Sequence, residues 1–245
     1  MIRKSQLFLA VAALVGMNAA MAACNTTQWG QGSPPGGAVV GTPLAADPVA
    51  TGVGGDNTEV ARYSGKCGMG STAVGQYVQD GLPLAEGGYI VRFYVRPTIT
   101  SGEAVVMNAM ADEAPDYAIF KVAYDGAAQQ IKVYGSNGSG GFLGTVSSFP
   151  AARGRWHAVE VAYARGAGTN TGTLNSSVIG GRNFNVPEFG TAATASIPAV
   201  AIAASGDGVD FAQFGWVSGA ASGGGITVDA FESRRSTAIG FLQRG

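Results

Sequence analysis

The chain has 245 residues, of which 46% are hydrophobic and 13% are charged, and its formal net charge is −1. This balance provides no basic field that would gather nucleic acid, and the hydrophobic content excludes a globally disordered chain. One His and two Cys cannot complete a four-ligand structural zinc site unless carboxylates contribute.

Residues 1–22 have the pattern of a secretory signal peptide. Arg3 and Lys4 precede an apolar run over 7–15, and Ala-Met-Ala at 20–22 is a small-x-small cleavage site. The run is shorter than the ~20 residues that a transmembrane helix needs. We expect a mature chain that begins at Ala23, has no transmembrane segment and is exported to the periplasm or the medium.

The two cysteines leave two alternatives open. In an oxidising compartment Cys24 and Cys67 are expected to form a disulfide. It would close a loop of about forty residues and contribute ~4 kcal/mol on the chain-entropy model. The alternative is lipidation of Cys24, because the preceding residues are similar to a lipobox. Met21 stands where lipoboxes usually carry Leu, and lipidation would leave Cys67 unpaired, so the disulfide is favoured.

Residues 23–57 read as a loop-rich arm, with Gly-Ser-Pro-Pro-Gly-Gly at 32–37. From residue 58 onward the hydrophobic pattern has a period of two and predicts strands, with no helix. The clearest strand is 89–96, which ends at Pro97. One face of it carries Tyr89, Val91, Phe93 and Val95, and the other carries Ile90, Arg92, Tyr94 and Arg96.

Further strands are predicted along the rest of the chain, at 104–110, 119–124, 130–134, 156–163, 197–204, 211–217 and 226–231. The turn over 125–128 predicts a hairpin between 119–124 and 130–134. A Gly-rich turn over 218–225 predicts a second hairpin, and 197–204 is expected to be a buried strand. Short strands with Gly-rich turns predict a single all-β domain over 58–245, a sandwich or a barrel. No phosphate-binding Gly motif occurs, so a nucleotide site is not expected.

Three segments resemble the concanavalin A-like superfamily, especially its laminin-G-like members. They are the strand 89–97 (YIVRFYVRP), the segment 154–161 (GRWHAVEV) and the segment 225–232 (GITVDAFE). The resemblance covers roughly residues 63–240. It implies an antiparallel jelly-roll sandwich of two sheets, and it favours binding of sugar or protein. The E-x-D-x-E pattern of the superfamily's laminarinase-type glycoside hydrolases is missing, so the resemblance does not imply catalysis.

Two surfaces are candidate ligand sites. Arg92, Tyr94 and Arg96 share one strand face, and two arginines fit poorly between packed sheets, so these residues form the candidate glycan-binding face. The acidic loops with Asp112, Glu113 and Asp116 and with Asp207 and Asp210 could hold calcium, which prefers carboxylate and carbonyl oxygens on loops. Solvated turns would explain the same acids, since Asp is common in turns for its own backbone hydrogen bonds.

The sequence shows few residues in the arrangements that catalysis requires. His157 would have to serve any catalytic triad, but it shares a face with Val159, Val161 and Tyr163, which favours a buried histidine hydrogen-bonded to the backbone. No two acids occupy positions i and i+2 of a clear strand, as a glycosidase pair would require.

We therefore expect a secreted, non-catalytic binding module for glycan or a cell-surface protein, not an enzyme, with calcium as the one candidate cofactor. The alternatives are a structural or adhesion component of the cell envelope, or a polysaccharide-active enzyme with an unrecognised site.

Overall fold

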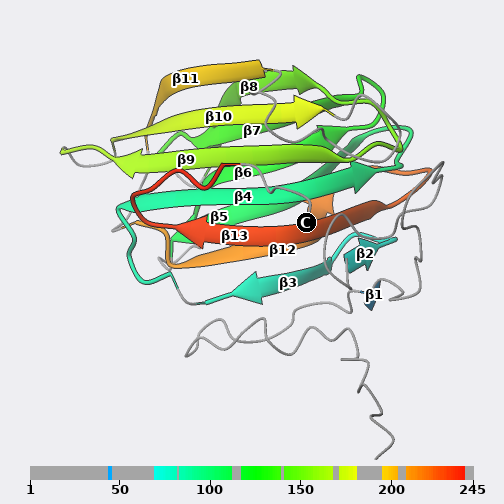
Figure 1. Cartoon of the computed structure of the whole chain (residues 1–245), viewed down its shortest axis with the longest axis horizontal. Helices are drawn as coiled ribbons and strands as arrows, with labels where there is room; N and C mark the ends of the chain where they lie inside the picture. The colour runs from blue at the N-terminus through cyan, green and yellow to red at the C-terminus, as the bar shows by residue number, and fades with distance from the viewer. Residues whose placement is uncertain are drawn as a thin grey trace, which may run out of the picture.

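The computed structural model describes residues 44–45, 69–81, 83–111, 117–138, 141–167, 171–180, 195–203 and 208–240. These residues form two antiparallel sheets that pack face to face (Figure 1). They include no helix of the length and hydrophobicity needed to cross a membrane. The predicted signal peptide, Cys24 and Cys67 lie outside the described residues. Of the predicted arm, only Leu44–Ala45 is described, and it pairs with the strand at Met69–Ser71.

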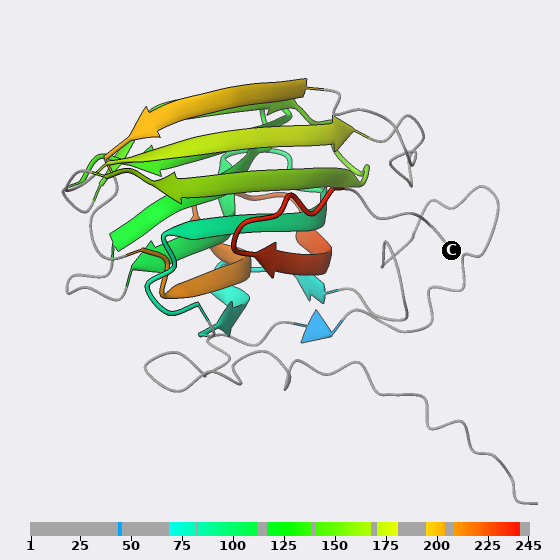
Figure 2. The same ribbon diagram turned by 60° about the vertical axis from the view of Figure 1, so that its left-hand side comes forward.

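The first sheet has seven strands in the order β1-β2-β13-β4-β9-β10-β11. Its strands are β1 (Leu44–Ala45), β2 (Met69–Ser71), β13 (Ile226–Arg234), β4 (Gly88–Pro97), β9 (His157–Arg165), β10 (Gly172–Gly180) and β11 (Ala195–Ile202). In Figure 2 these strands run side by side, with β11 at the upper edge. The predicted buried strand near 197–204 is therefore the edge strand β11.

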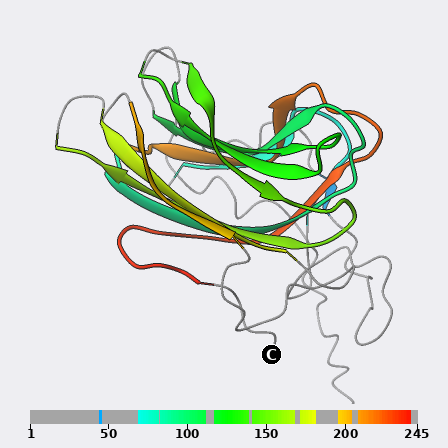
Figure 3. The same cartoon turned by 90° about the horizontal axis from the view of Figure 1, so that it is seen from above.

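The second sheet has six strands in the order β3-β12-β5-β6-β7-β8. Its strands are β3 (Gln76–Asp80), β12 (Phe211–Gly219), β5 (Glu103–Ala111), β6 (Tyr117–Asp125), β7 (Gln130–Ser136) and β8 (Phe142–Pro150). Figure 3 shows the two curved layers stacked on each other. The predicted all-β, two-sheet sandwich is confirmed.

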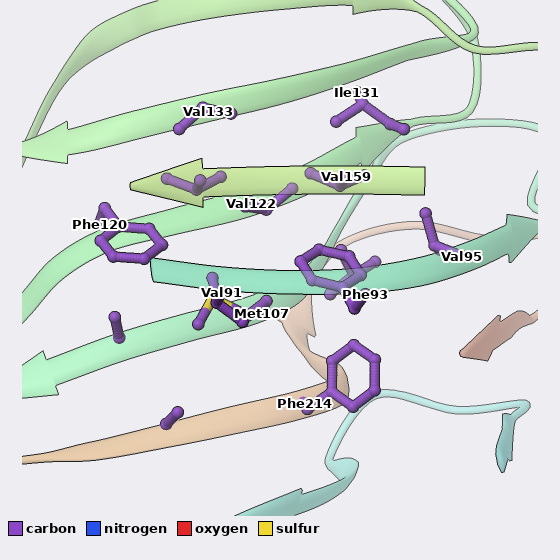
Figure 4. Close-up of a cluster of buried hydrophobic side chains, with 14 of the residues drawn as sticks. Val91, Phe93, Val95, Met107, Phe120, Val122, Ile131, Val133, Val159 and Phe214 are labelled. Atoms are coloured by element: carbon purple, nitrogen blue, oxygen red, sulfur yellow. The ribbon is translucent and has the colours of Figure 1, made fainter. Parts of the chain in front are cut away.

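The core lies between the sheets and is built from the inward-facing residues of their strands. On β4, Tyr89, Val91, Phe93 and Val95 share one face, as predicted, and all four are fully buried in this core. The rings of Phe93 on β4 and Phe214 on β12 meet edge to face, with centroids 5.1 Å apart, and so join the two sheets (Figure 4). Trp156 is also fully buried.

One predicted hairpin is confirmed and one is wrong. β6 and β7 pair through the turn after Asp125, as the sequence indicates. β12 and β13 do not pair with each other: β12 lies in the six-stranded sheet and β13 in the seven-stranded sheet. The Gly-rich segment between them crosses from one sheet to the other, which alternation and turn composition do not distinguish from a hairpin.

Candidate functional site

The outer face of the six-stranded sheet carries a continuous row of polar side chains. Each residue of the row is the direct cross-strand partner of the next, so all six side chains emerge on the same face. We call this set the polar row. In spatial order it consists of Gln79, Gln213, Asn108, Lys121, Tyr134 and Thr145, one from each strand from β3 to β8.

The strands place the polar row outward because their neighbouring residues fill the core. Phe120 and Val122 flank Lys121 on β6, and both are fully buried. Val133 precedes Tyr134 on β7 and is fully buried as well. With strands about 4.8 Å apart, five gaps make the row roughly 24 Å long. The row is therefore long enough to contact several units of an extended polymer.

Amide groups form one half of the polar row. Asn108 Nδ2 donates to Gln213 Oε1 at 3.2 Å, and Gln213 Nε2 donates to Gln79 Oε1 at 3.0 Å and to Tyr77 Oη at 3.4 Å. Asn108 Oδ1 is buried and has no hydrogen-bond partner among the described residues. A buried acceptor left without a donor costs free energy, so this end of the amide chain is incomplete in the protein alone.

A cation and two aromatic rings form the other half. Lys121 Nζ lies 4.5 Å from the ring centroid of Tyr134 and 4.5 Å from that of Phe142. The two rings meet edge to face, with centroids 6.4 Å apart. The rings hold the ammonium by cation–π attraction. Among the described residues no salt bridge to Lys121 is found.

The hydroxyl of Tyr134 reaches a charged cluster beside the row. Tyr134 Oη donates to Glu103 Oε2 at 2.5 Å. Lys132 Nζ lies 3.6 Å from the same Glu103 oxygen and 2.6 Å from Asp125 Oδ2. Glu103 and Asp125 are direct cross-strand partners on β5 and β6. The cluster therefore links four side chains in the order Asp125, Lys132, Glu103 and Tyr134.

This environment shifts three pKa values. Burial, and then the hydrogen bond to Glu103, raise the pKa of Tyr134 above its ordinary 10.0, while Thr145 has a smaller opposite effect. The hydrogen bond to Asp125 raises the pKa of Lys132. The backbone N–H of Ala128 and the Lys132 ammonium lower the pKa of Asp125. At neutral pH Tyr134 is thus a phenol, while Lys132 and Asp125 are a charged pair.

The predicted glycan-binding face lies on the opposite side of the molecule, on the seven-stranded sheet. Tyr94 is fully buried, and Arg92 is 3% exposed. Arg92 Nη2 pairs with Glu232 at 2.7 Å and Nη1 donates to the carbonyl of Gly240, while Arg96 Nε donates to that of Gly154. The three residues lie on one face, as predicted, and that face is occupied by contacts with the protein's own chain.

The predicted calcium loops lie largely outside the described residues. Asp112, Glu113, Asp116 and Asp207 are not described, and Asp210 Oδ1 accepts a hydrogen bond from the backbone N–H of Ala85 at 2.8 Å. Two described ends come together here, because the N–H of Asp210 donates to the carbonyl of Met110, just before the first acidic loop. The described residues contain no group of three or more potential metal ligands. Calcium binding stays a prediction.

His157 has the surroundings that the sequence indicated. It is 2% exposed, and its Nε2 lies 2.8 Å from the carbonyl oxygen of Ala152. Because a carbonyl accepts only, Nε2 carries the proton of this hydrogen bond. Burial lowers the pKa of His157. The residue therefore lies in the interior as a neutral imidazole, away from the polar row.

Sequence reasoning did not find the polar row. Each member is an ordinary polar residue at an outward position of its own strand. Only the order of the strands and their register bring the six together, and neither can be read from one strand at a time.

No protein-family model matches the chain, and no curated protein matches it in sequence. Solved structures that it is similar to include an alginate lyase from Alteromonas, with 10% identity and a TM-score of 0.36 over 71% of this chain and 82% of that chain. A family 7 alginate lyase matches with 12% identity and a TM-score of 0.41, over 71% of this chain and 80% of that chain. A Trypanosoma rangeli sialidase matches with 12% identity and a TM-score of 0.38, over 69% of this chain but only 26% of that chain.

These structures share jelly-roll sandwich folds of the concanavalin A-like kind, and none of them confirms the narrower laminin-G-like resemblance. They are carbohydrate-active enzymes, which contradicts the prediction of a non-catalytic binding module that is not an enzyme. At such low identity the likeness concerns the fold alone. An activity of this chain has to be supported by its own side chains.

Proposed function

We propose that this protein is a carbohydrate-active enzyme that cleaves an acidic polysaccharide bound across the six-stranded sheet. The observation that carries the proposal is the polar row, which runs without interruption across all six strands. Amides, a phenol and an ammonium suit the hydroxyl and carboxylate groups of such a polymer. An extended chain would lie along the row, across the direction of the strands.

Lys121 supports an acidic substrate. Its ammonium lies against the rings of Tyr134 and Phe142, and no carboxylate of the described residues forms a salt bridge with it. A sugar carboxylate would therefore find a positioned counter-charge at the centre of the row. Neutral polysaccharides would bind through the amides alone and more weakly.

The same position supports β-elimination over hydrolysis. Neutralising a carboxylate stabilises the negative charge that develops when the neighbouring C–H proton is removed. Tyr134 is the neighbouring acid–base group, because its ring lies against the Lys121 ammonium and its hydroxyl is hydrogen-bonded to Glu103. Hydrolysis would need two carboxylic groups facing each other across the substrate, whereas the two carboxylates described beside the row, Glu103 and Asp125, are bridged by Lys132.

We also propose that the reaction takes place outside the cytoplasm. The support is the signal-peptide pattern of residues 1–22 and the two cysteines, Cys24 and Cys67. Detection of the protein in periplasmic or culture fractions would test this location directly.

The test of the activity uses uronate-containing and neutral polysaccharides. Elimination is read from the ultraviolet absorbance of unsaturated ends, and hydrolysis from new reducing ends without that absorbance. Parallel assays with calcium and with EDTA test whether the candidate calcium loops affect the activity. We expect elimination of acidic chains only; no cleavage of any acidic chain, or equal cleavage of neutral ones, would contradict the proposal.

Lys121→Gln removes the positive charge from the row. We expect the rate on acidic chains to fall about 100-fold, the scale of losing one group that stabilises developing charge. The matched control is Arg165→Gln, at the end of β9 in the other sheet, which should keep the wild-type rate. An unchanged rate in Lys121→Gln would show that the row does not bind the carboxylate.

A further inference from the structure

In the protein without ligand, the hydroxyl proton of Tyr134 is already used in a hydrogen bond. Its Oη donates to Glu103 Oε2 at 2.5 Å, so the O–H bond is directed along the sheet towards β5. A phenol has one proton and accepts through its lone pairs. Tyr134 Oη therefore accepts through its lone pairs, one of which is engaged by the side chain of Thr145.

Glu103 is in turn held in place by charge. Lys132 Nζ lies 3.6 Å from Glu103 Oε2, and Lys132 is itself anchored by Asp125 at 2.6 Å. Asp125 is anchored by the backbone N–H groups of Ala127 and Ala128, at 3.0 and 2.9 Å. The turn between β6 and β7 thus determines the position of the Glu103 carboxylate through two ion pairs. Such an arrangement keeps the acceptor of the phenolic proton stationary.

We propose that Glu103 is the positioning residue and proton acceptor of Tyr134, which makes the phenol oxygen the base of the elimination. This inference rests on the proposed function. In the step, the substrate C–H proton moves to Tyr134 Oη while the phenolic proton moves to Glu103 Oε2. The C–H electron pair forms the new C=C bond, the bond to the glycosidic oxygen breaks, and that oxygen takes a proton from solvent. Glu103 then returns its proton through Tyr134 or to water.

The first test measures Tyr134 in the protein without substrate. Its ionisation is obtained as the difference between the ultraviolet pH titrations of wild type and Tyr134→Phe. The carboxylate of Glu103 opposes formation of a phenolate, whereas Thr145 and Lys132 favour it. We therefore expect Tyr134 to ionise at a lower pH in Glu103→Gln, measured against Glu103→Gln with Tyr134→Phe. No change in this titration would overturn the inference, whatever the enzyme's activity.

The second test uses the elimination rate. In Glu103→Gln the amide can still accept the hydrogen bond from Tyr134 but cannot take its proton. We expect kcat to fall about 100-fold with little change in KM, because a general base contributes on this scale. Glu103→Asp should recover part of the rate, which a purely structural role would not predict.

Glu160→Gln on β9 is the matched control, because Glu160 accepts backbone hydrogen bonds from Ile239 and Gly240 on the opposite sheet. It should keep the wild-type pH profile. A wild-type protein that cleaves acidic chains while Glu103→Gln keeps the same kcat and pH profile would overturn the inference and leave the proposed function standing. A wild-type protein that cleaves no polysaccharide would overturn the proposed function, and the catalytic role of Glu103 with it.

Discussion

At the scale of single residues, burial decides what a titratable group does in this protein. His157 is 2% exposed and hydrogen-bonded to a carbonyl, so desolvation keeps it neutral. Tyr134 is only partly buried, lies beside Lys121 and is bonded to a carboxylate. In the sequence His157 stands out as a catalytic candidate because it is the only histidine, whereas Tyr134 is one of eight tyrosines and has no such distinction.

The buried histidine predicts a pH-dependent stability. The folded-state pKa of His157 is lowered from 6.5, so below that value the unfolded chain binds the proton more readily than the folded one. The contribution of His157 to the free energy of unfolding is complete above pH 6.5. It is lost as the pH falls towards the folded-state pKa, with a slope of at most about 1.4 kcal/mol per pH unit. Urea unfolding in neutral and mildly acidic buffers measures this slope.

His157→Gln should have a smaller slope over the same range, whatever its stability at neutral pH. Since the chain has one histidine, its imidazole NMR resonances report the folded-state pKa directly. A resonance that titrates at or above 6.5 would contradict the burial argument.

At the scale of elements, β4 and β13 are joined by more than their ladder. Arg92 and Glu232 are direct cross-strand partners and form a 2.7 Å ion pair, in which Arg92 is almost fully buried. After β13 the chain passes back over the sheet, where Gly240 accepts from Arg92 and donates to Glu160. In Figure 1 this segment lies over β4 and β9. One arginine therefore holds the strand pair and the segment that covers it.

Glu232→Ala should be costly because it leaves a buried guanidinium without its carboxylate. We expect a loss of about 2 kcal/mol in the free energy of unfolding, below the range for fully buried pairs because Glu232 is partly exposed. The matched control is Arg234→Ala: Arg234 pairs with the same glutamate at 2.7 Å but is 43% exposed, and exposed pairs contribute at most about 1 kcal/mol. Equal losses in the two variants, measured by urea unfolding, would contradict the distinction.

The elements differ in how well the sequence predicts them. β4 carries Tyr89, Val91, Phe93 and Val95 at alternate positions, and all four are fully buried in the core. β8 and β10 were not predicted, because Gly, Ser and Thr dilute their apolar pattern. The wrongly predicted hairpin between β12 and β13 has another cause. Alternation identifies a strand but does not say which sheet the strand joins.

At the scale of the whole molecule, one core and one outer face are made by the same strands. The pairing that puts Phe120, Val122 and Val133 into the core also lines up Lys121 and Tyr134 outside it. The type of fold follows from the core pattern, so the sequence predicts it. The polar row depends on strand order and register across all six strands, which are set by packing between residues far apart in the chain.

Because the core and the outer face are separate, substitutions of two phenylalanines should have opposite effects on stability and activity. Phe214 is 2% exposed and contacts Phe93 across the sheets, so Phe214→Ala should reduce the free energy of unfolding by about 3–5 kcal/mol. Phe142 is partly exposed and lies against Lys121 on the outer face, so Phe142→Ala should cost about 1 kcal/mol or less in the free energy of unfolding.

Activity should change the other way. In conditions where both variants are folded, the loss of the ring beside Lys121 should weaken acidic-polysaccharide cleavage, and the loss of Phe214 should not. Urea unfolding and the elimination rate measure the two properties separately. A Phe142→Ala protein with the wild-type rate would show that the ring does not position Lys121 for the substrate.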